Sequence, residues 1–486
     1  MNRPIRRVVV AVVILLLALV GNLTYVQFVK AKALATDPAN VRVLISDYSY
    51  QRGSIIADGT SVASSVKTSD RLTYLRRYSD GPTYAPVTGF DSLIYSTAGI
   101  ERTENSTLTG NNDKLALRNL KSLLTGKQRR GGNVVLTVNR DAQEAAYRGL
   151  QGHNGAAVAL NPRTGAILAM ASTPSWDPNT LSSHDPQQIR TTYNRLIKDP
   201  ADPLLDKAIS ATYPPGSIFK TVVAAAALSA GKTTPDTRIP APDGYQLPGS
   251  SHVLHNFQGE TCGNGQTDTL IHAYAISCNT AFAGLGVQLG EQALREQAKK
   301  LGLDTGSFTM PLNVARSTVG DISDAASLAL SSIGQDNVQI TPMQAAMMAA
   351  AVANDGTLMK PYLVKQTEAS DLAVVNRTEP KVMSKAMTPA VARQVGTMMR
   401  AVVTDGTGRG AALTGIEVSG KTGTADNAPG KAAHAWFIGY APGKDVAVAV
   451  FLANAAGSGN DVTSGGTAGP IASSVIKAVV NSKGTH

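Results

Sequence analysis

Apolar and polar positions divide the chain into three parts, and the first part is a long apolar segment. After three arginines, residues 8–29 contain no charged side chain. A helix that rises about 1.5 Å per residue crosses the roughly 30 Å hydrocarbon core of a membrane within this length. The pattern predicts a tail at 1–7 in the cytoplasm and a single-pass membrane helix at 8–29, with everything beyond it on the extracytoplasmic side, because basic residues stay inside. A cleaved signal peptide, with Ala33 and Ala35 near the cleavage site, is the alternative.

The second part, residues 31–130, has the pattern of a small, mostly β domain next to the membrane. An apolar run at 55–57 is followed by Asp58 and Gly59, a pair that favours a tight turn between antiparallel strands. The stretch 127–132 is basic and rich in glycine, as expected of a domain boundary. The sequence therefore predicts a hairpin in this part and a separate domain after it.

The third part, residues 131–486, has strand patterns near both of its ends and alanine-rich helical patterns between them. Strands are expected at 134–138, 156–160, 166–171, 417–425, 433–440 and 446–452, and helices at 140–151, 221–230, 271–289, 290–301, 342–353 and 468–481. The arrangement is typical of an α+β fold in which early and late strands share one antiparallel sheet. Helices would flank this sheet, and a helical subdomain would be inserted between the two groups of strands.

Composition and charge narrow the class of protein. The chain has 486 residues, with 45 Lys and Arg against 35 Asp and Glu, so its formal charge is +10. This excess favours an anionic neighbour such as a phospholipid surface. Only 5% of the residues are aromatic and no basic block is interleaved with them, so no nucleic-acid partner is expected. Two cysteines and seven scattered histidines lack metal-binding spacing, so neither a metal nor another cofactor is expected.

A serine followed three residues later by a lysine places a hydroxyl and an amine on one face of a helix, which suits a nucleophile and its base. The spacing occurs three times, at Ser64 and Lys67, at Ser217 and Lys220, and at Ser474 and Lys477. Only the second pair follows a Pro-Pro-Gly turn and opens an apolar helix. Ser217 would lie at the helix N-terminus, where the dipole stabilises negative charge, and desolvation would lower the pKa of Lys220. These two residues are the candidate nucleophile and base.

Two further motifs complete a constellation with this pair. Ser277 supplies a hydroxyl able to relay a proton, and Asn279 supplies an amide able to orient Lys220 or a substrate carbonyl. A Lys-Thr-Gly-Thr run follows on the strand expected at 417–425 and consists of Lys421, Thr422, Gly423 and Thr424. Its ammonium would keep the site positive and its hydroxyls would bind a carboxylate. Its glycine would let a substrate backbone lie against the strand.

Ser217-x-x-Lys220, Ser277-x-Asn279 and Lys421-Thr422-Gly423 stand in the order and rough spacing of the motifs of penicillin-binding proteins and serine β-lactamases. Upstream, Arg52-Gly53 with Asp58-Gly59 resembles the opening of the N-terminal domain of class B penicillin-binding proteins. The chain is similar to this class, and in its size and short membrane-proximal region it looks most like the penicillin-binding protein A group. The resemblance implies a transpeptidase-like domain at 131–486.

The resemblance also implies an activity, the crosslinking of peptidoglycan stem peptides by a D,D-transpeptidase that uses a serine acyl-enzyme. Ser217 would attack the carbonyl between two terminal D-alanines, with Lys220 as base and Ser277 as relay. The backbone N–H groups of Ser217 and Thr424 would form the oxyanion hole, and donors of this kind typically contribute about 3–4 kcal/mol each. β-Lactams would acylate Ser217 by the same route. Expected partners are the membrane, a polytopic glycan polymerase and other proteins of division or elongation.

Alternative functions use the same fold. A D,D-carboxypeptidase or a β-lactam-hydrolysing enzyme would pass the acyl group to water, and a non-catalytic scaffold or antibiotic sensor would only keep the fold. A sensor should carry several membrane helices and an intracellular effector, and the sequence shows neither. A class A β-lactamase needs a deacylating glutamate, and the nearest candidate, Glu291, lies on a helical stretch only 12 residues beyond Asn279. A scaffold should have lost a motif residue, and none is missing. The transpeptidase is therefore the predicted function.

Cys262 and Cys278 stand 16 residues apart, and the second is the middle residue of the Ser277-x-Asn279 motif. In an oxidising compartment such a pair can form a disulfide. A bridge would tie down the loop that carries the motif and constrain the unfolded chain by about 3 kcal/mol in the entropy model. Two buried thiols are the alternative, because the spacing does not fix the distance between the two side chains.

Overall fold

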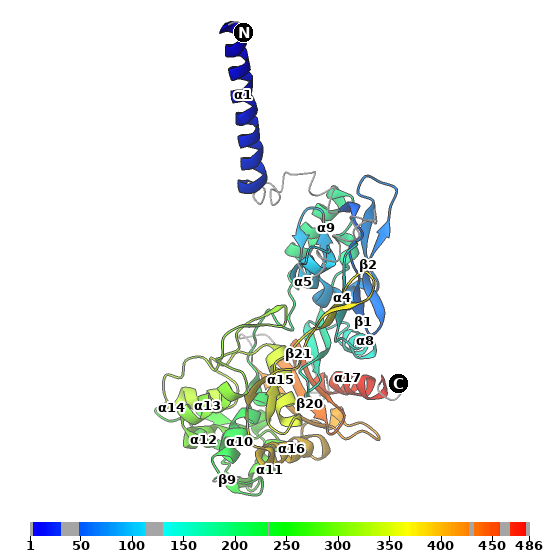
Figure 1. Ribbon diagram of the computed structural model, residues 1–486. Coiled ribbons are helices and arrows are strands. Elements are labelled where there is room, and N and C mark those ends of the chain that lie inside the picture. The colour runs from blue at the N-terminus through cyan, green and yellow to red at the C-terminus, as the bar shows by residue number, and fades with distance from the viewer. Residues whose placement is uncertain are drawn as a thin grey trace.

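The structure is a computed structural model that describes residues 3–30, 48–112, 130–231, 233–426, 432–456 and 467–482. Ala33 and Ala35, on which the signal-peptide alternative rests, lie outside the described residues. Two β-sheets and the helices around them form the bulk of the molecule, and one long helix stands apart at the N-terminus (Figure 1).

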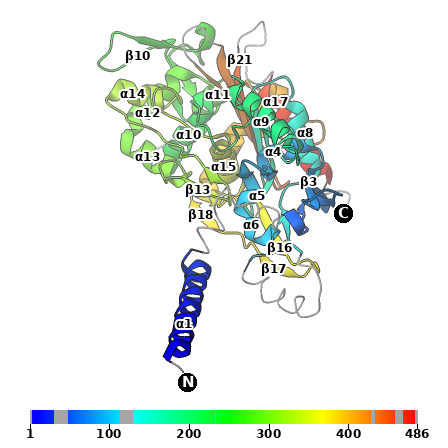
Figure 2. The ribbon, with the colours of Figure 1, turned by 90° about the horizontal axis from the view of Figure 1, so that it is seen from above.

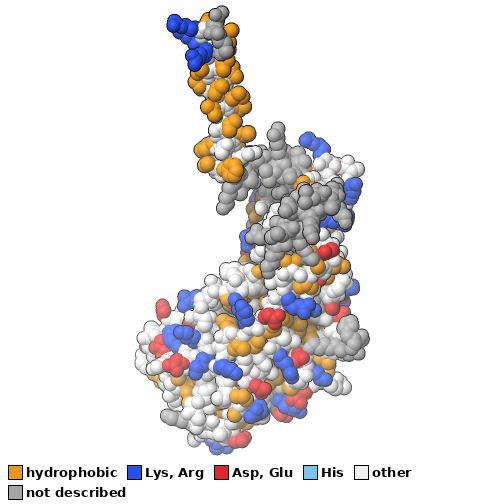
Figure 3. Space-filling view, viewed as in Figure 1, with side chains coloured by type: hydrophobic (Ala, Val, Ile, Leu, Met, Phe, Trp, Pro, Cys, Tyr) orange, Lys and Arg blue, Asp and Glu red, His pale blue; other side chains and the backbone are white. Residues whose placement is uncertain are grey.

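Helix α1 spans Arg3–Thr24 and continues as the π-helical turn η1, Tyr25–Val29. None of its side chains is buried against the rest of the molecule. Figure 3 shows apolar side chains along most of this helix and basic side chains at its N-terminal tip. Within the described ranges it is the one helix long and apolar enough to cross a membrane. Its length and composition agree with the membrane span predicted at 8–29.

The first sheet has six strands in the order β17-β16-β6-β1-β2-β3. Their bounds are Val374–Arg377, Val364–Glu368, Asn133–Leu136, Ile55–Ala57, Thr60–Lys67 and Tyr74–Tyr78. Strands β1 and β2 form the predicted hairpin, in which Ala57 pairs with Thr60. Asp58 and Gly59 occupy the turn with φ of 50° and 73°, the left-handed values that such tight turns require.

Strands from distant parts of the chain complete this sheet. Strand β6 pairs in parallel with β1 and antiparallel with β16, so residues 364–368 extend the sheet that begins at Ile55. The N-terminal part also contains short helices and a two-stranded ribbon, namely α4 Gly81–Thr88, α5 Gly99–Thr103, α6 Asn105–Leu108, β4 Asp91–Ser92 and β5 Ser96–Thr97. Residues 31–130 were predicted to be mostly β, and in the structure these short helices accompany the strands.

Arg52 and Gly53 have structural roles in this N-terminal part. The Arg52 Nε lies 2.6 Å from Glu101 Oε2, and Arg76 Nε lies 2.6 Å from Glu101 Oε1. Glu101 is fully buried, and although burial alone would raise its pKa, the charges of Arg76 and Arg52 outweigh burial and lower it. A β-carbon on Gly53 would lie 1.8 Å from the carbonyl oxygen of Gly132, so only glycine fits between these segments.

The second sheet combines early and late strands, as predicted. Its order is β19-β20-β21-β7-β8, with all neighbours antiparallel. The strands are β19 Ser419–Ala425, β20 Ala433–Ala441, β21 Val446–Ala456, β7 Gly155–Leu160 and β8 Ile167–Thr173. Strand β19 is at one edge, and no strand of the described residues pairs with the outer side of its backbone.

Helices cover both faces of the second sheet, and successive side chains on each strand alternate between them. On β20, Trp436 and Ile438 pack into the core shared with α15, whereas Phe437 packs into the core shared with α8 and α17. The bounds of these helices are Pro342–Ala353, Arg140–Gly149 and Ala468–Ser482. Figure 2 shows α8 and α17 on one side of the sheet and α15 on the other. This burial on both faces explains the nearly continuous apolar strands.

The helical subdomain lies between the two groups of strands in the sequence. Its helices are α10 Lys220–Ser229, α11 Leu270–Ala275, α12 Asn279–Leu289, α13 Glu291–Lys300, α14 Ala325–Ser331 and α16 Pro389–Thr404. The helical stretch predicted at 271–289 is divided into α11 and α12. Ser277 lies in the break with φ of 65°, a left-handed value that ends a right-handed helix. The break places the serine motif at a turn instead of on a continuous helix.

Candidate active site

Ser217 lies in a short 3-10 helix, η3, Gly216–Phe219, which leads directly into α10. Gly216 has φ of 54°, and its N–H donates to the carbonyl of Gly334 at 2.9 Å. A β-carbon on Gly216 would lie 2.2 Å from the carbonyl oxygen of Thr424. Only glycine allows this approach, because a β-carbon would collide with strand β19. The backbone that immediately precedes Ser217 therefore packs against this strand.

Ser217 lines a cavity of about 520 Å³, together with Ser277, Asn279, Thr422 and Thr424. The structure thus brings residues from all three sequence motifs to one site. The Ser217 hydroxyl has no hydrogen-bond partner among the described residues, so it is available to a molecule in the cavity.

Lys220 is fully buried and contacts two residues that line this cavity. Its Nζ donates to the backbone oxygen of Ser277 at 2.7 Å and to Asn279 Oδ1 at 2.7 Å, and it lies 3.3 Å from Ser277 Oγ. Lys421, also fully buried, donates from Nζ to Ser277 Oγ at 2.9 Å. The Ser277 hydroxyl therefore lies between the two amines and can pass a proton from one to the other.

Burial acts on the charge of both lysines. It lowers the pKa of Lys220 well below its usual value of 10.5, and the neighbouring positive charge of Lys421 lowers it further. Burial lowers the pKa of Lys421 to about 7. In these surroundings Lys220 can be a neutral amine near neutrality, and a neutral amine can accept a proton from a nucleophile.

Asn279 is the first residue of α12, and a side chain from a distant segment caps the N-terminus of this helix. The side-chain oxygen of Asn256 accepts from the N–H groups of Asn279 at 2.9 Å and Thr280 at 3.1 Å. Asn256 is buried, with 6% of its surface exposed, so these bonds are shielded from water. Sequence reasoning missed Asn256, because a cap more than twenty residues before its helix has no local signature.

Strand β19 carries the Lys-Thr-Gly-Thr motif along the edge of the cavity. The Thr422 hydroxyl lies 2.5 Å from the Thr407 hydroxyl, and Thr407 also lines the cavity. Thr407 was missed by sequence reasoning, since nothing in its surroundings distinguishes it from other loop threonines. The pairing fixes the direction of the Thr422 hydroxyl.

Gly423 has a packing role in the structure, and its predicted role beside a substrate backbone stays a prediction. A β-carbon there would lie 2.8 Å from Ile218 Cγ2 and 2.9 Å from the carbonyl oxygen of Pro215. These atoms belong to the segment that carries Ser217. The absence of a side chain at Gly423 therefore lets the chain's own nucleophile segment pack against β19.

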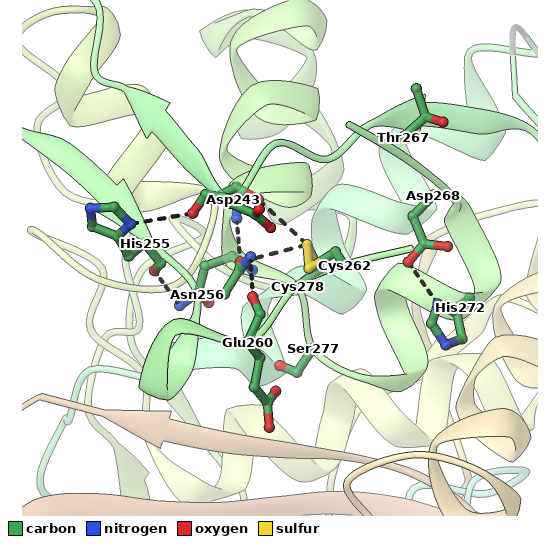
Figure 4. Close-up of a disulfide and its surroundings, with 12 residues drawn as sticks. Asp243, His255, Asn256, Glu260, Cys262, Thr267, Asp268, His272, Ser277 and Cys278 are labelled. Carbon is green, nitrogen blue, oxygen red and sulfur yellow. Dashed lines mark hydrogen bonds and ion pairs between the residues drawn. A yellow bond between two sulfur atoms is a disulfide. The ribbon is translucent and has the colours of Figure 1, made fainter. Parts of the chain in front are cut away.

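Cys262 and Cys278 form a disulfide in the structure, with Cα atoms 6.1 Å apart (Figure 4). The bond joins the loop after the hairpin of β10, Gly244–Gln246, and β11, Val253–His255, to the turn that carries Ser277. Within the described ranges, no group of three His, Cys, Asp or Glu residues is arranged to hold a metal ion.

The other two Ser-x-x-Lys pairs lie outside the site. Ser64 and Lys67 are on strand β2, so they are not on one face of a helix. Ser474 lies on α17, where its hydroxyl donates to the backbone oxygen of Pro470 at 2.9 Å. This is the bond to the preceding turn that a serine in a helix interior favours.

Two family models match the chain. The penicillin binding protein transpeptidase domain matches residues 155–477, and the penicillin binding protein A dimerisation domain matches residues 52–134. The first model covers more than half of the chain and includes every candidate motif residue. The chain therefore belongs to the penicillin-binding protein transpeptidase family. This result confirms the predicted fold class and the predicted enzyme class, a serine-type D,D-transpeptidase.

Full-length relatives specify the group within this family. The chain is 44% identical over 494 residues to a peptidoglycan D,D-transpeptidase PbpA of Mycolicibacterium smegmatis, covering 99% of both chains. It is 43% identical over 490 residues to the protein of the same name from Mycobacterium tuberculosis, again covering 99% of both. The predicted resemblance to the penicillin-binding protein A group is confirmed.

Solved structures agree with this placement. Penicillin-binding protein A from M. tuberculosis as a ceftriaxone acyl-enzyme matches with a TM-score of 0.86 and 42% identity, over 90% of this chain and 99% of that chain. Its penicillin G acyl-enzyme matches with a TM-score of 0.84 and 42% identity, over 88% of this chain and 99% of that chain. These similar proteins thus form covalent complexes with β-lactams.

Proposed function

We propose that this chain crosslinks peptidoglycan stem peptides through an acyl-enzyme on Ser217. The observation that carries the proposal is the position of the Ser277 hydroxyl, 3.3 Å from Lys220 Nζ and 2.9 Å from Lys421 Nζ. This arrangement lies at the cavity that Ser217 lines. A nucleophile, an amine of lowered pKa and a relay group are the parts that serine acyl transfer requires.

In the acylation step, Ser217 Oγ attacks the carbonyl carbon between two terminal D-alanines and loses its proton to the neutral amine of Lys220. The backbone N–H groups of Ser217 and Thr424 donate to the oxygen that becomes negative, which stabilises the transition state by about 3–4 kcal/mol for each donor. The proton then passes through Ser277 to the leaving amine. The terminal D-alanine departs and an ester on Ser217 remains.

Substrate binding involves the groups along the cavity wall. The hydroxyls of Thr422 and Thr424 bind the terminal carboxylate of the donor peptide, and the positive charge of Lys421 supports them. The side-chain oxygen of Asn279 accepts from Lys220 at 2.7 Å, and its amide N–H₂ donates to the carbonyl of His255 at 3.4 Å. We propose that this amide turns to the backbone of the donor peptide when substrate binds. Gly423 keeps the nucleophile segment against this wall.

In the second step, an amine of a neighbouring stem peptide attacks the ester carbon. A C–N bond forms, the bond from carbon to Ser217 Oγ breaks, and the proton lost by the amine returns through Lys220 to Ser217. A β-lactam enters the first step in the same way, and opening of its ring leaves it bound to Ser217. The acyl-enzyme structures of the M. tuberculosis protein support this route.

The test is covalent labelling of the full-length protein with a fluorescent penicillin. Ser217→Ala is expected to abolish labelling, because no other hydroxyl replaces the attacking oxygen. Ser474→Ala is the matched control, since it removes a serine with the same Ser-x-x-Lys spacing, and it should label like the wild type. Labelling of Ser217→Ala would reject Ser217 as the nucleophile, and no labelling of the wild type would reject catalysis and favour a non-catalytic scaffold.

Product analysis distinguishes the transpeptidase from the enzymes that use water. With a stem-peptide donor and a second stem peptide as acceptor, the proposal requires crosslinked dimer. Release of D-alanine with only shortened peptide would identify a D,D-carboxypeptidase, and steady turnover of penicillin would identify a β-lactam-hydrolysing enzyme.

We further propose that residues 8–29 anchor the protein in the cell membrane, with 1–7 in the cytoplasm and the domains at 31–130 and 131–486 outside. The apolar, fully exposed surface of α1 and the basic residues that precede its apolar stretch support this orientation. Such an anchor would hold the enzyme beside a polytopic glycan polymerase that supplies its substrate, together with other division or elongation proteins. Protease added outside intact cells should digest both domains, and co-purification from membranes should recover the polymerase.

A further inference from the structure

The wall of the active-site cavity carries a carboxylate that the reaction steps above do not use. Glu260 follows the 3-10 turn η4, Phe257–Gly259, and lines the same cavity as Ser217 and Ser277. Figure 4 shows its side chain extending from the loop toward the side on which Ser277 lies. The carboxylate has no hydrogen bond or ion pair with another described residue, so its charge is available to a molecule in the cavity.

The backbone of Glu260 is fixed to the catalytic turn. Its carbonyl oxygen accepts from Asn256 Nδ2 at 3.0 Å, and its N–H donates to Phe257 at 3.0 Å. The same Asn256 side chain caps α12 at Asn279, and the disulfide at Cys262 follows two residues later. The backbone of Glu260 is therefore held by the Asn256 side chain that also caps the helix beginning at Asn279.

Charge is distributed unevenly across this cavity. The amines of Lys220 and Lys421 both contact the lining residue Ser277, and the acidic side chains among the described lining residues are Glu260 and Asp426. A positively charged lysine amine attracts the terminal carboxylate of the donor peptide. A negatively charged side chain on the cavity wall repels a carboxylate and attracts a cation. The second step of the reaction brings such a cation, because a primary alkylamine with a pKa of about 10.4 is protonated at neutral pH.

We infer that Glu260 binds the ammonium group of the acceptor stem peptide and determines the preference of the acyl-enzyme for a cationic amine. This inference rests on the proposed function of Ser217. Glu260 holds the ammonium near the ester, the ammonium loses one proton to water, and the free amine attacks the ester carbon. The C–N bond then forms, the bond to Ser217 Oγ breaks, and the second proton reaches Ser217 through Lys220.

The experiment measures how the acyl-enzyme partitions between two nucleophiles. Full-length protein is acylated with a peptidyl-D-alanyl thioester in the presence of N-acetyl-1,5-diaminopentane, a cation at pH 7, and hydroxylamine, which is neutral there. The ratio of amide to hydroxamate product is compared between variants, and it does not depend on how fast each variant is acylated. Glu260→Gln is expected to lower this ratio by about 5-fold, as for an exposed ion pair, and added salt should shrink the difference.

Two further variants make the test specific. Glu260→Lys places a positive charge at the same position and should lower the ratio by more than about 10-fold. Glu296→Gln, which removes an exposed glutamate on α13 away from the cavity, should keep the wild-type ratio. A wild-type ratio in Glu260→Gln, in a protein that still forms hydroxamate, would overturn the inference and leave the proposed function intact. Absence of both products in the wild type would reject the proposed function itself.

Discussion

Ser277 shows how much the chemistry depends on single residues. Its backbone oxygen and its hydroxyl both lie within hydrogen-bond reach of Lys220, and its hydroxyl also accepts from Lys421. The left-handed backbone at this residue, with φ of 65°, allows both contacts from one position. A non-glycine residue in this conformation is strained, and such strain is found preferentially at functional sites.

Lys421 should control the pH at which Lys220 becomes active. Burial is the larger cause of the lowered Lys220 pKa, and the positive charge of Lys421 is the smaller cause. Lys421→Met removes a charge that disfavours protonation, so the Lys220 pKa should rise. The rate of penicillin acylation should then reach its plateau at a higher pH, because the neutral amine is formed only above this pKa.

Acylation rates measured from pH 5 to pH 10 provide the check for this prediction. Lys477→Met, which removes an exposed lysine on α17, is the control and should retain the wild-type midpoint. A Lys421→Met profile with an unchanged midpoint, or one moved to lower pH, would show that Lys421 does not act on Lys220 through its charge.

Among the secondary-structure elements, the turn between α11 and α12 depends most on distant residues. Its conformation is held by the disulfide to Cys262, by the Asn256 cap and by the amine of Lys220. None of these contacts comes from the turn itself. Apolar, alanine-rich sequence lies on both sides of the turn, which is why a single helical stretch was predicted.

Asn256→Ala should weaken this element measurably. The substitution leaves two N–H groups at the start of α12 without an acceptor, one buried and one partly buried, and an unsatisfied buried group costs about 1–3 kcal/mol. We expect a lower melting temperature and slower penicillin acylation, since Asn279 loses its support. The control is Asn264→Ala, because Asn264 accepts from two backbone N–H groups in an exposed turn where water can replace it. Equal melting temperatures for the two variants would contradict the capping role.

For the complete protein, the first sheet makes the N-terminal part and the transpeptidase part interdependent. Val134 and Leu136 on β6 are buried, and β6 has β1 on one side and β16 on the other. A chain that begins at residue 131 would lose β1 and expose this apolar strand along an unpaired edge. We expect this truncated protein to aggregate, or to melt well below a chain of residues 48–486.

Expression of both truncated proteins, followed by size-exclusion chromatography and thermal melting, tests this expectation. A soluble monomer of residues 131–486 with the melting temperature of the longer chain would show that the boundary at residue 131 separates independently stable domains.

Local patterns predicted most of the second sheet and the apolar N-terminal helix. The Asp58-Gly59 hairpin and the helical stretches at 221–230 and 342–353 were also predicted, because tight turns and amphipathic or apolar periods arise from neighbours in the chain. The pairing of β6 with β1 and β16 was not predicted. This pairing joins residues far apart in sequence, and the residue pattern of one strand does not show which distant strand it pairs with.

The order and chemistry of the motifs are enough to indicate a serine acyltransferase, because a nucleophile, a base and a carboxylate-binding strand are residue types that can be read in sequence. The fold supplies the distances. Only folding buries Lys220 and Lys421 beside one hydroxyl, turns the Gly423 face toward the nucleophile segment, and brings Asn256, Thr407 and Glu260 to the cavity. Desolvation and side-chain contacts involve residues that are distant in the sequence and close in the fold. The residue pattern therefore identifies the reacting groups, and the tertiary structure sets their pKa values and their reactivity.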